Sequence, residues 1–279
     1  MKKRSLLQRL IGAPYVLWAA IFIVVPLFIV LYYSFTDADG TFTFANIREL
    51  GDYKEILWIS IEYSVIATVI TLIVSYPFAY VMSRKREHTQ RIMMLLVMVP
   101  MWMNLLILTY SWMNILEKNG LINTLLGMVH LPPLKLIETP GAVIFGMIYN
   151  YIPYMVLPIY SVMSKIDPSL LEAAEDLGSG SLSKLRRVIL PLSVPGVVSG
   201  VTMVFVPSIT AFTVPALIGN GAYMLYGNKI ETAITSAAGY HRNDYSVGST
   251  LSIILLLCIV ISTLIMNHFD KDKEGGSIL

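Results

Sequence analysis

Six long apolar runs, separated by short polar segments, constrain this chain more than any other feature. An α-helix of about 20 apolar residues crosses the hydrocarbon core of a bilayer, and it satisfies its own backbone hydrogen bonds while doing so. The sequence therefore predicts an all-α membrane protein. Its six transmembrane helices are expected at residues 15–33, 59–82, 92–113, 142–162, 194–217 and 247–266.

The composition agrees with a membrane protein and argues against several other classes. Charged residues make up 14% of the 279 residues and the mean hydropathy is +0.68, whereas soluble domains carry about 25% charged residues. The net charge of +2 is too small to indicate a nucleic-acid partner. The four histidines lack metal-ligand spacing and Cys258 is the single cysteine, so we expect no metal site and no intrachain disulfide.

Basic residues predict the orientation, because cytoplasmic loops are enriched in Lys and Arg. With the N-terminus inside, both termini are cytoplasmic and 14 of the 20 basic residues face the cytoplasm. The first run is too long for a signal peptide and no small-x-small cleavage pattern follows it, so we expect a retained helix. The six basic residues expected outside are Arg48, Lys54, Lys118, Lys135, Lys229 and Arg242.

Two features leave alternatives open. Residues 46–57, which are followed by Trp58, fit either a short helix on the outer interface or an ordinary acidic loop. Prolines interrupt the fourth and fifth apolar runs and predict bends around a pathway, although proline is also common in membrane helices. These prolines are Pro153, Pro158, Pro195, Pro207 and Pro215.

The cytoplasmic loop at about residues 165–191 is the most informative segment. Asp167 suits an N-cap, Pro168 suits the first helical position and Gly178 suits a stop, so the sequence predicts a helix over Pro168–Leu177. A second helix is expected over Leu182–Leu190, capped by Ser181 and ended by Pro191. On the first helix one face is apolar (Leu170, Ala173, Ala174, Leu177) and another is acidic (Glu172, Glu175, Asp176). Two short amphipathic helices of this kind could dock into a groove of a soluble partner, or they could simply form a solvated amphipathic loop.

The same loop resembles a known family. Glu172-Ala173-Ala174, three residues, Gly178, nine residues and Val188-Ile189-Leu190-Pro191 resemble the EAA loop of bacterial ABC importer permeases, whose pattern is E-A-A-x3-G-x9-I-x-L-P. The one departure is Val188 in place of isoleucine, which is conservative.

This resemblance implies a type I importer permease fold, with residues 1–279 as a single permease domain in the bacterial cell membrane. The loop would couple the helices to a separate ATP-binding subunit: Glu172 would pair with a basic group, Ala173 and Ala174 would pack in a cleft, and Gly178 would allow a sharp turn. Leu190 and Pro191 complete the motif. The implied partners are two ATP-binding subunits, a second and non-identical permease, and an extracytoplasmic binding protein.

Catalysis is not expected in this chain. It has no G-x-x-x-x-G-K-[ST] phosphate loop and no recognisable nucleophile–base signature, so ATP and Mg²⁺ would bind to the partner ATPase. A self-sufficient carrier or channel is the rival class, but it would need several charges within its helices, and only Glu62 qualifies.

The substrate is indicated by a second, less specific resemblance. Three segments are similar to the permeases of spermidine/putrescine importers: residues 211–219, the stretch Met224 to Ile230, and Arg242-Asn243-Asp244-Tyr245. This resemblance implies a polyamine, although importers for thiamine, iron and small anions have related permeases.

Four residues are candidates for the substrate pathway, because ammonium groups bind acceptors and aromatic faces. They are Glu62, Trp102, Asn150 and Tyr154. The alternative is that the aromatic residues anchor the interface and that Glu62 reaches water.

Overall fold

The computed structural model describes residues 14–37, 40–48, 51, 53–237 and 242–274, and this part of the chain is helical apart from its connections and one isolated bridge between Thr36 and Phe42. Two compact units divide the chain, one from residues 1–54 and 229–258 and the other from residues 55–228 and 259–279. The basic residues expected before the first helix lie outside the described residues. Among the described helices, five are long and apolar enough to span a membrane, or six if one bent pair counts as a span. The five spans are Pro14–Ser34, Lys54–Ser83, Pro140–Met163, Ser181–Ile209 and Tyr245–Met266.

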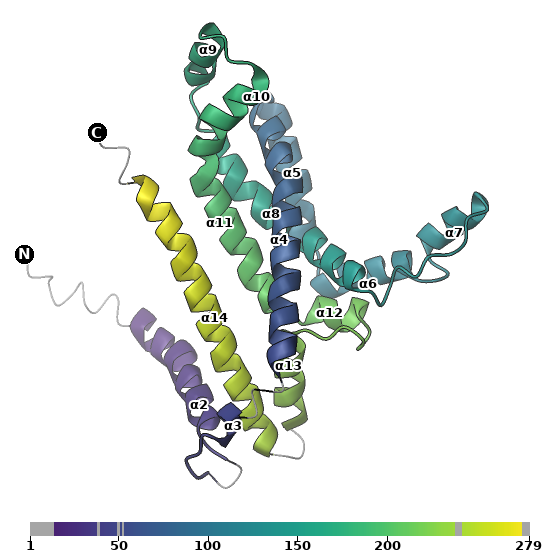
Figure 1. The fold of residues 1–279 in the computed structure, drawn as a ribbon, viewed down its shortest axis with the longest axis vertical. Coiled ribbons are helices and arrows are strands. Elements are labelled where there is room, and N and C mark those ends of the chain that lie inside the picture. Colours follow the sequence, from purple (N-terminus) through teal and green to yellow (C-terminus); the bar gives the residue numbers. More distant parts are fainter. Residues whose placement is uncertain (1–13, 38–39, 49–50, 52, 238–241, 275–279) are drawn as a thin grey trace, which may run out of the picture. The chain divides into compact units, whose positions relative to one another are not determined.

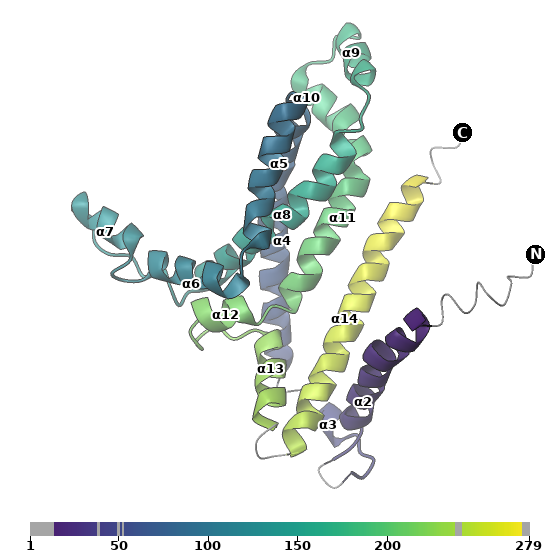
Figure 2. The ribbon, with the colours of Figure 1, turned by 180° about the vertical axis from the view of Figure 1, so that it is seen from behind.

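Four helices form the centre of the larger unit: α4 (Lys54–Ser83), α5 (Glu87–Trp102), α8 (Pro140–Met163) and α11 (Leu190–Ile209). Helix α8 packs against both α11 and α5, and the two ribbon views agree on this arrangement (Figures 1 and 2). Glycines allow the close approach of α11 to α8. A Cβ atom on Gly196 would lie 2.8 Å from the Pro158 carbonyl oxygen, and one on Gly200 would lie 2.7 Å from the Met155 sulfur.

Helix α4 buries a stripe of small polar residues without leaving most of their hydroxyls unpaired. The hydroxyls of Ser64, Thr68 and Thr71 each bond the carbonyl four residues earlier, at 2.6–2.7 Å. Ser60 does the same and also accepts the Tyr226 backbone N–H at 2.8 Å. These back-bonds let polar residues lie in a buried helix face that lacks water.

The segment at residues 46–57 differs from both expectations. Only Ala45–Arg48 forms a short helix, α3, and α4 already begins at Lys54, so residues 54–57 extend the second span. Residues 49, 50 and 52 lie outside the described part. Because neither Pro nor Gly stands between Lys54 and Ser60, the helix extends beyond the N-terminal end of its apolar run.

The third span is bent rather than straight, so the prediction of one continuous helix at residues 92–113 is wrong. Helix α5 ends at Trp102, α6 (Leu105–Leu116) begins after Asn104, and the segment from α6 through α7 (Leu121–Met128) lies at 93° to α5. The cause is local: Asn104 is extended, and its side chain accepts the Leu106 backbone N–H at 2.8 Å. Asn104 therefore caps a new helix.

The fifth span also departs from the prediction of a helix over residues 194–217. Helix α11 ends at Ile209 and a separate α12 covers Thr213–Ile218. The break is held by the first turn of α13 (Tyr226–Ala237): a Cβ atom on Gly227 would lie 2.7 Å from the carbonyl oxygens of Thr210 and Ala211, and Asn228 Nδ2 donates to the Phe212 carbonyl at 2.7 Å. By contrast, Pro153 and Pro158 lie within the continuous α8.

The smaller unit contains η1 (Ala20–Val24), α2 (Val25–Ser34), α3 and the first half of α14 (Arg242–Glu274). The buried Ser34 hydroxyl donates to the Thr250 hydroxyl at 3.1 Å. The Asn46 side chain donates to the carbonyls of Ser34 and Thr36 at 3.1 and 3.0 Å. Helix α14 contains the predicted sixth span and extends beyond it at both ends.

We predict that Gly196→Ala lowers the stability of the permease by about 1–3 kcal/mol, because the new methyl group meets backbone atoms that cannot rotate away. The measurement is the midpoint of thermal unfolding in detergent. Gly127→Ala is the control, since it also adds a methyl group to a helix but has nothing within 4 Å. Equal midpoints for the two variants would contradict the packing described here.

Candidate functional site: the loop at residues 165–191

The first loop helix, α9 (Pro168–Asp176), begins at a well-formed cap. Asp167 Oδ1 accepts the Ser169 backbone N–H at 2.9 Å, and Pro168 occupies the first turn. Hydrogen bonds from the Ser169 backbone and side chain hold the pKa of Asp167 below its usual range. The charged cap is therefore complete above the ordinary pKa of an aspartate and weakens only as the pH falls through the lowered value, so it is intact near neutral pH.

The helix ends in a hydrogen-bonded turn that requires glycine. Gly178 has φ of +77°, its N–H bonds the Glu175 carbonyl at 2.8 Å, and the Ser179 N–H bonds the Ala174 carbonyl at 2.9 Å. This pair of bonds is the Schellman motif. A Cβ atom on Gly178 would meet nothing within 4 Å, so the requirement for glycine here is conformational and not one of space.

The loop returns to the membrane through a π turn. After α10 (Ser181–Lys184) the chain forms η3 (Leu185–Ile189) and continues directly into α11, so the predicted helix end at Pro191 is wrong. The Leu190 N–H bonds the Leu185 carbonyl five residues earlier. Because this wider turn changes the hydrogen-bond register, the helix passes Pro191, which has no N–H to donate. The first residue of α10 is Ser181, but the preceding Gly180 holds the cap position.

Buried side chains anchor both ends of the loop. Ile166 and Ile189 belong to the same buried cluster as Tyr160 and Met163, and Leu171 packs against that cluster. Lys184 of α10 pairs with Glu175 of α9, so the two short helices are joined directly. The sequence did not predict this pair, because an ion pair across the glycine turn depends on the angle of that turn.

The surface of the loop exposes apolar side chains beside charged ones. Leu170, Leu177 and Leu182 are 47%, 87% and 78% exposed, and Ala173 is also exposed. Of the face predicted from the sequence, only Ala174 turns partly inward, while Glu172 is exposed beside the apolar residues. A capped helix that presents leucines to solvent has the character of a docking surface. Figure 1 shows α9 and α10 at one end of the larger unit, with α6 and α12 at the other.

The four candidate pathway residues lie on three helices. Glu62 is exposed on α4, Trp102 is 68% exposed at the end of α5, and Tyr154 is exposed on α8. Asn150, one turn before Tyr154, is half-buried and donates to the Gly146 carbonyl at 2.8 Å. In the part of the chain that the structure describes, no hydrogen bond or ring contact joins any two of the four.

The tyrosines near Asn150 do not form one cluster. Tyr149 packs edge-on against Trp112, with ring centroids 4.8 Å apart, and Tyr151 lies 6.3 Å from Tyr154. Tyr160 lies near the C-terminal end of α8, and its hydroxyl donates to the Gln90 side chain. Within the described residues, no group of three or more His, Cys, Asp or Glu side chains is arranged to hold a metal ion.

A family comparison identifies the class of protein. Residues 75–275, which include the whole loop at residues 165–191, match the family described as binding-protein-dependent transport system inner membrane component. The chain belongs to this family. It is therefore a transport component, a permease, and a multi-pass protein of the bacterial inner membrane.

Relatives of the permease cover most of its length. It is 34% identical over 254 residues to the spermidine/putrescine transport system permease protein PotB of Haemophilus influenzae, covering 87% of this chain and 88% of that one. The protein of the same name from Escherichia coli is 32% identical and covers 89% and 92%. The inner membrane ABC transporter permease protein YdcU of Escherichia coli is 29% identical and covers 71% and 70%.

Solved structures support the fold. A bacterial ABC transporter involved in the import of the acidic polysaccharide alginate has a chain that matches with a TM-score of 0.77 at 16% identity, covering 95% of both chains. The same kind of transporter in complex with an alginate pentasaccharide-bound periplasmic protein matches with a TM-score of 0.76 at 15% identity, covering 95% of this chain and 94% of that one. The permease therefore has the ABC importer permease fold that the sequence predicted.

We predict that Gly178→Ala loosens the end of α9, because alanine at a positive φ is strained by about 1–2 kcal/mol. The measurement is amide hydrogen exchange in the purified permease, with faster exchange expected at Gly178 and Ser179. Gly180→Ala is the matched control, since Gly180 has φ of −65° and equally open space. If both variants exchange as the wild type does, the backbone at residue 178 does not need glycine.

Proposed function

We propose that this permease couples ATP hydrolysis in a partner subunit to the import of polyamines. The observation that carries the substrate class is the similarity to two spermidine/putrescine transport system permeases over nearly nine-tenths of the chain. The coupling role rests on the cytoplasmic loop, which is capped at both ends and exposes its apolar residues.

In this proposal the loop docks in a cleft of the ATP-binding subunit. Leu170, Ala173 and Leu177 would enter the cleft, and Glu172 would pair with a basic group at its edge. Gly178 would make the turn that keeps α10 clear of the partner. Leu190 and Pro191 would carry the motion into α11 through the π turn. The docking free energy would come mainly from covering the leucines, at roughly 25 cal/mol for each Å² of apolar surface.

The assembly contains further chains. A matched importer structure is a complex with a periplasmic protein, which supports an extracytoplasmic binding protein as a partner of this permease. We further propose two ATP-binding subunits, a second and non-identical permease, and cytoplasmic termini. The basic residues at the α4–α5 turn and around η3 support this orientation, since they would lie on the cytoplasmic side.

Substrate would pass between the two permeases in an alternating-access cycle. A loaded binding protein would deliver the polyamine from outside, ATP binding would open the permeases outward, and hydrolysis would restore the inward-facing state. Glu62 supplies a carboxylate, and the exposed rings of Trp102 and Tyr154 supply faces that attract ammonium groups. Asn150 adds an amide beside Tyr154.

We predict that spermidine or putrescine, with the cognate binding protein, stimulates the ATPase activity of the importer reconstituted in lipid nanodiscs. Thiamine, ferric iron and a small anion serve as controls. Stimulation by one of these compounds alone would keep the importer and exclude polyamines. Failure of any ATPase to assemble with the permease would instead favour a self-sufficient carrier or channel.

We predict that Glu62→Gln lowers the maximal rate of polyamine uptake about tenfold, which corresponds to ~1.4 kcal/mol of lost stabilisation of the cation. The maximal rate is the right quantity, because the binding protein sets the apparent affinity. Glu55→Gln is the control, since it neutralises an exposed carboxylate two turns nearer the outer end of α4. Equal losses in both variants would show a general surface charge effect and would remove Glu62 from the pathway.

A further inference from the structure

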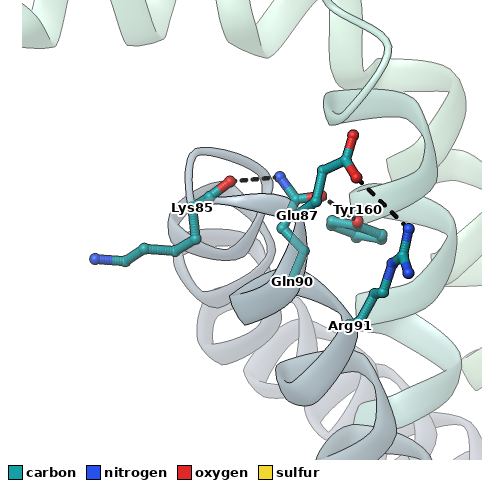
Figure 3. A network of polar contacts seen from close by, with 5 residues as sticks. All are labelled: Lys85, Glu87, Gln90, Arg91 and Tyr160. Carbon is teal, nitrogen blue, oxygen red and sulfur yellow. Dashed lines mark hydrogen bonds and ion pairs between the residues drawn. The ribbon is translucent and has the colours of Figure 1, made fainter.

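A single glutamine closes the turn between α4 and α5. Gln90 Nε2 donates to the Lys85 carbonyl at 2.8 Å (Figure 3). It also donates to the Ser83 carbonyl at 3.2 Å. Ser83 is the last residue of α4, and Lys85 lies in the turn that follows. Gln90 belongs to the first turn of α5, so its amide group holds the end of one helix against the start of the next.

The same amide group reaches a third helix. Its Oε1 accepts the hydroxyl of Tyr160 on α8 at 2.8 Å (Figure 3). The orientation of the amide is determined by chemistry: the two carbonyls can only accept, so the nitrogen must face them and the oxygen must face the hydroxyl. Both N–H groups and the oxygen of the Gln90 side-chain amide therefore make hydrogen bonds.

Tyr160 connects the hydrogen-bonded Gln90 side chain to the cytoplasmic loop. The tyrosine is 9% exposed and lies one turn before the end of α8, where its carbonyl accepts the Ser164 N–H at 2.8 Å. It shares one buried cluster with Ile166 and Ile189, which flank the loop on its two sides. Met82 of α4 is part of that cluster, and Met93 and Met94 of α5 pack against it. The Tyr160–Gln90 hydrogen bond and the apolar contacts of this cluster thus join the same helices, α4, α5 and α8.

The neighbouring ion pair does not have this role. Glu87 and Arg91 are one turn apart on α5 at 3.5 Å, and both side chains are exposed (Figure 3). An exposed pair within one helix contributes little to stability and connects no other element. Gln90 and Tyr160, in contrast, join α4, α5 and α8 in a site where a broken bond would leave polar groups partly buried.

We propose that Gln90 and Tyr160 are positioning residues that make the α4–α5 turn and the cytoplasmic loop move as one body. This inference rests on the proposed coupling function of the loop. A displacement of α9 by the ATP-binding subunit would reach α8 within three residues of Tyr160. The hydrogen bond to Gln90 would carry it sideways into α5, whereas the loop backbone alone leads only to α8 and α11.

The test measures the distance between the two elements directly. Spin labels are placed at His88 in the first turn of α5 and at Lys165 before α9, both of which are exposed, in a Cys258→Ser background. In the assembled importer with wild-type Gln90 and Tyr160, the label distance is expected to remain the same with and without ATP. In Tyr160→Phe, which keeps the ring and removes only the hydroxyl, the distance is expected to change and broaden when ATP binds.

Tyr151→Phe is the matched control. It also removes one tyrosine hydroxyl from α8, but that hydroxyl bonds the Pro207 carbonyl of α11 at 3.1 Å and has no link to α5. Its label distances should match the wild type. Gln90→Met, which removes all three hydrogen bonds at similar volume, should repeat the effect of Tyr160→Phe. Substrate uptake per ATP hydrolysed should fall about threefold or more in these two variants and remain unchanged in the control.

Two results would overturn the proposal. One is a label distance that already changes with ATP in the wild type, because the two elements would then move independently. The other is a Tyr160→Phe protein that behaves like Tyr151→Phe. If polyamines are not the substrate, no polyamine uptake will be detected even in the wild type. The label distance should still change with ATP in Tyr160→Phe and stay constant in the wild type, so the two proposals fail separately.

Discussion

The structure depends on one constraint, which is that a membrane offers no water to unpaired backbone groups. The hydroxyls along α4 return to carbonyls of their own helix, so a buried polar face costs little. Where α11 breaks, Asn228 supplies a hydrogen bond to the Phe212 carbonyl. In the described residues, each π turn is followed at the second residue by a proline, Pro26 after η1 and Pro191 after η3. In both places an N–H bonds the carbonyl five residues earlier just before a residue that has no N–H, so the helix continues past the proline.

The positions of the helices could be predicted from the sequence, but their breaks could be predicted only in part. Apolar run length places a span, because burial in lipid is a property of each segment by itself. The break at Asn104 is also local, and an asparagine before Leu105 is a cap signal that hydropathy conceals. The break at Thr210 is different. It depends on Gly227 and Asn228, which come close only after the chain has folded, so no local pattern distinguishes Pro207 from the prolines that α8 accommodates.

In the loop at residues 165–191, too, local features could be predicted from the sequence and tertiary ones could not. Asp167, Pro168 and Gly178 act within a few residues of themselves, so the extent of α9 could be predicted within one residue. Which face lies inward could not, because Leu171 is set against the core by the anchors Ile166 and Ile189 at opposite ends of the loop. The pathway residues are the least constrained by the chain alone. Glu62, Trp102 and Tyr154 are exposed, and the surfaces that cover them in a permease pair belong to another subunit in the proposed assembly.

The ordered backbone of α9 and α10 has a consequence for the proposed coupling to the ATP-binding subunit. A segment that folds only on docking would spend part of its binding free energy on ordering its backbone, at about 1–2 kcal/mol for each residue. Here the Asp167 cap, the Schellman turn and the Glu175–Lys184 pair order α9 and α10 within the chain itself, while the leucines stay exposed. In the proposed assembly, such a loop would meet its partner already folded. Force applied to its surface would then be transmitted into the buried cluster, where α4, α5, α8 and η3 meet, and would not be absorbed by folding of the loop.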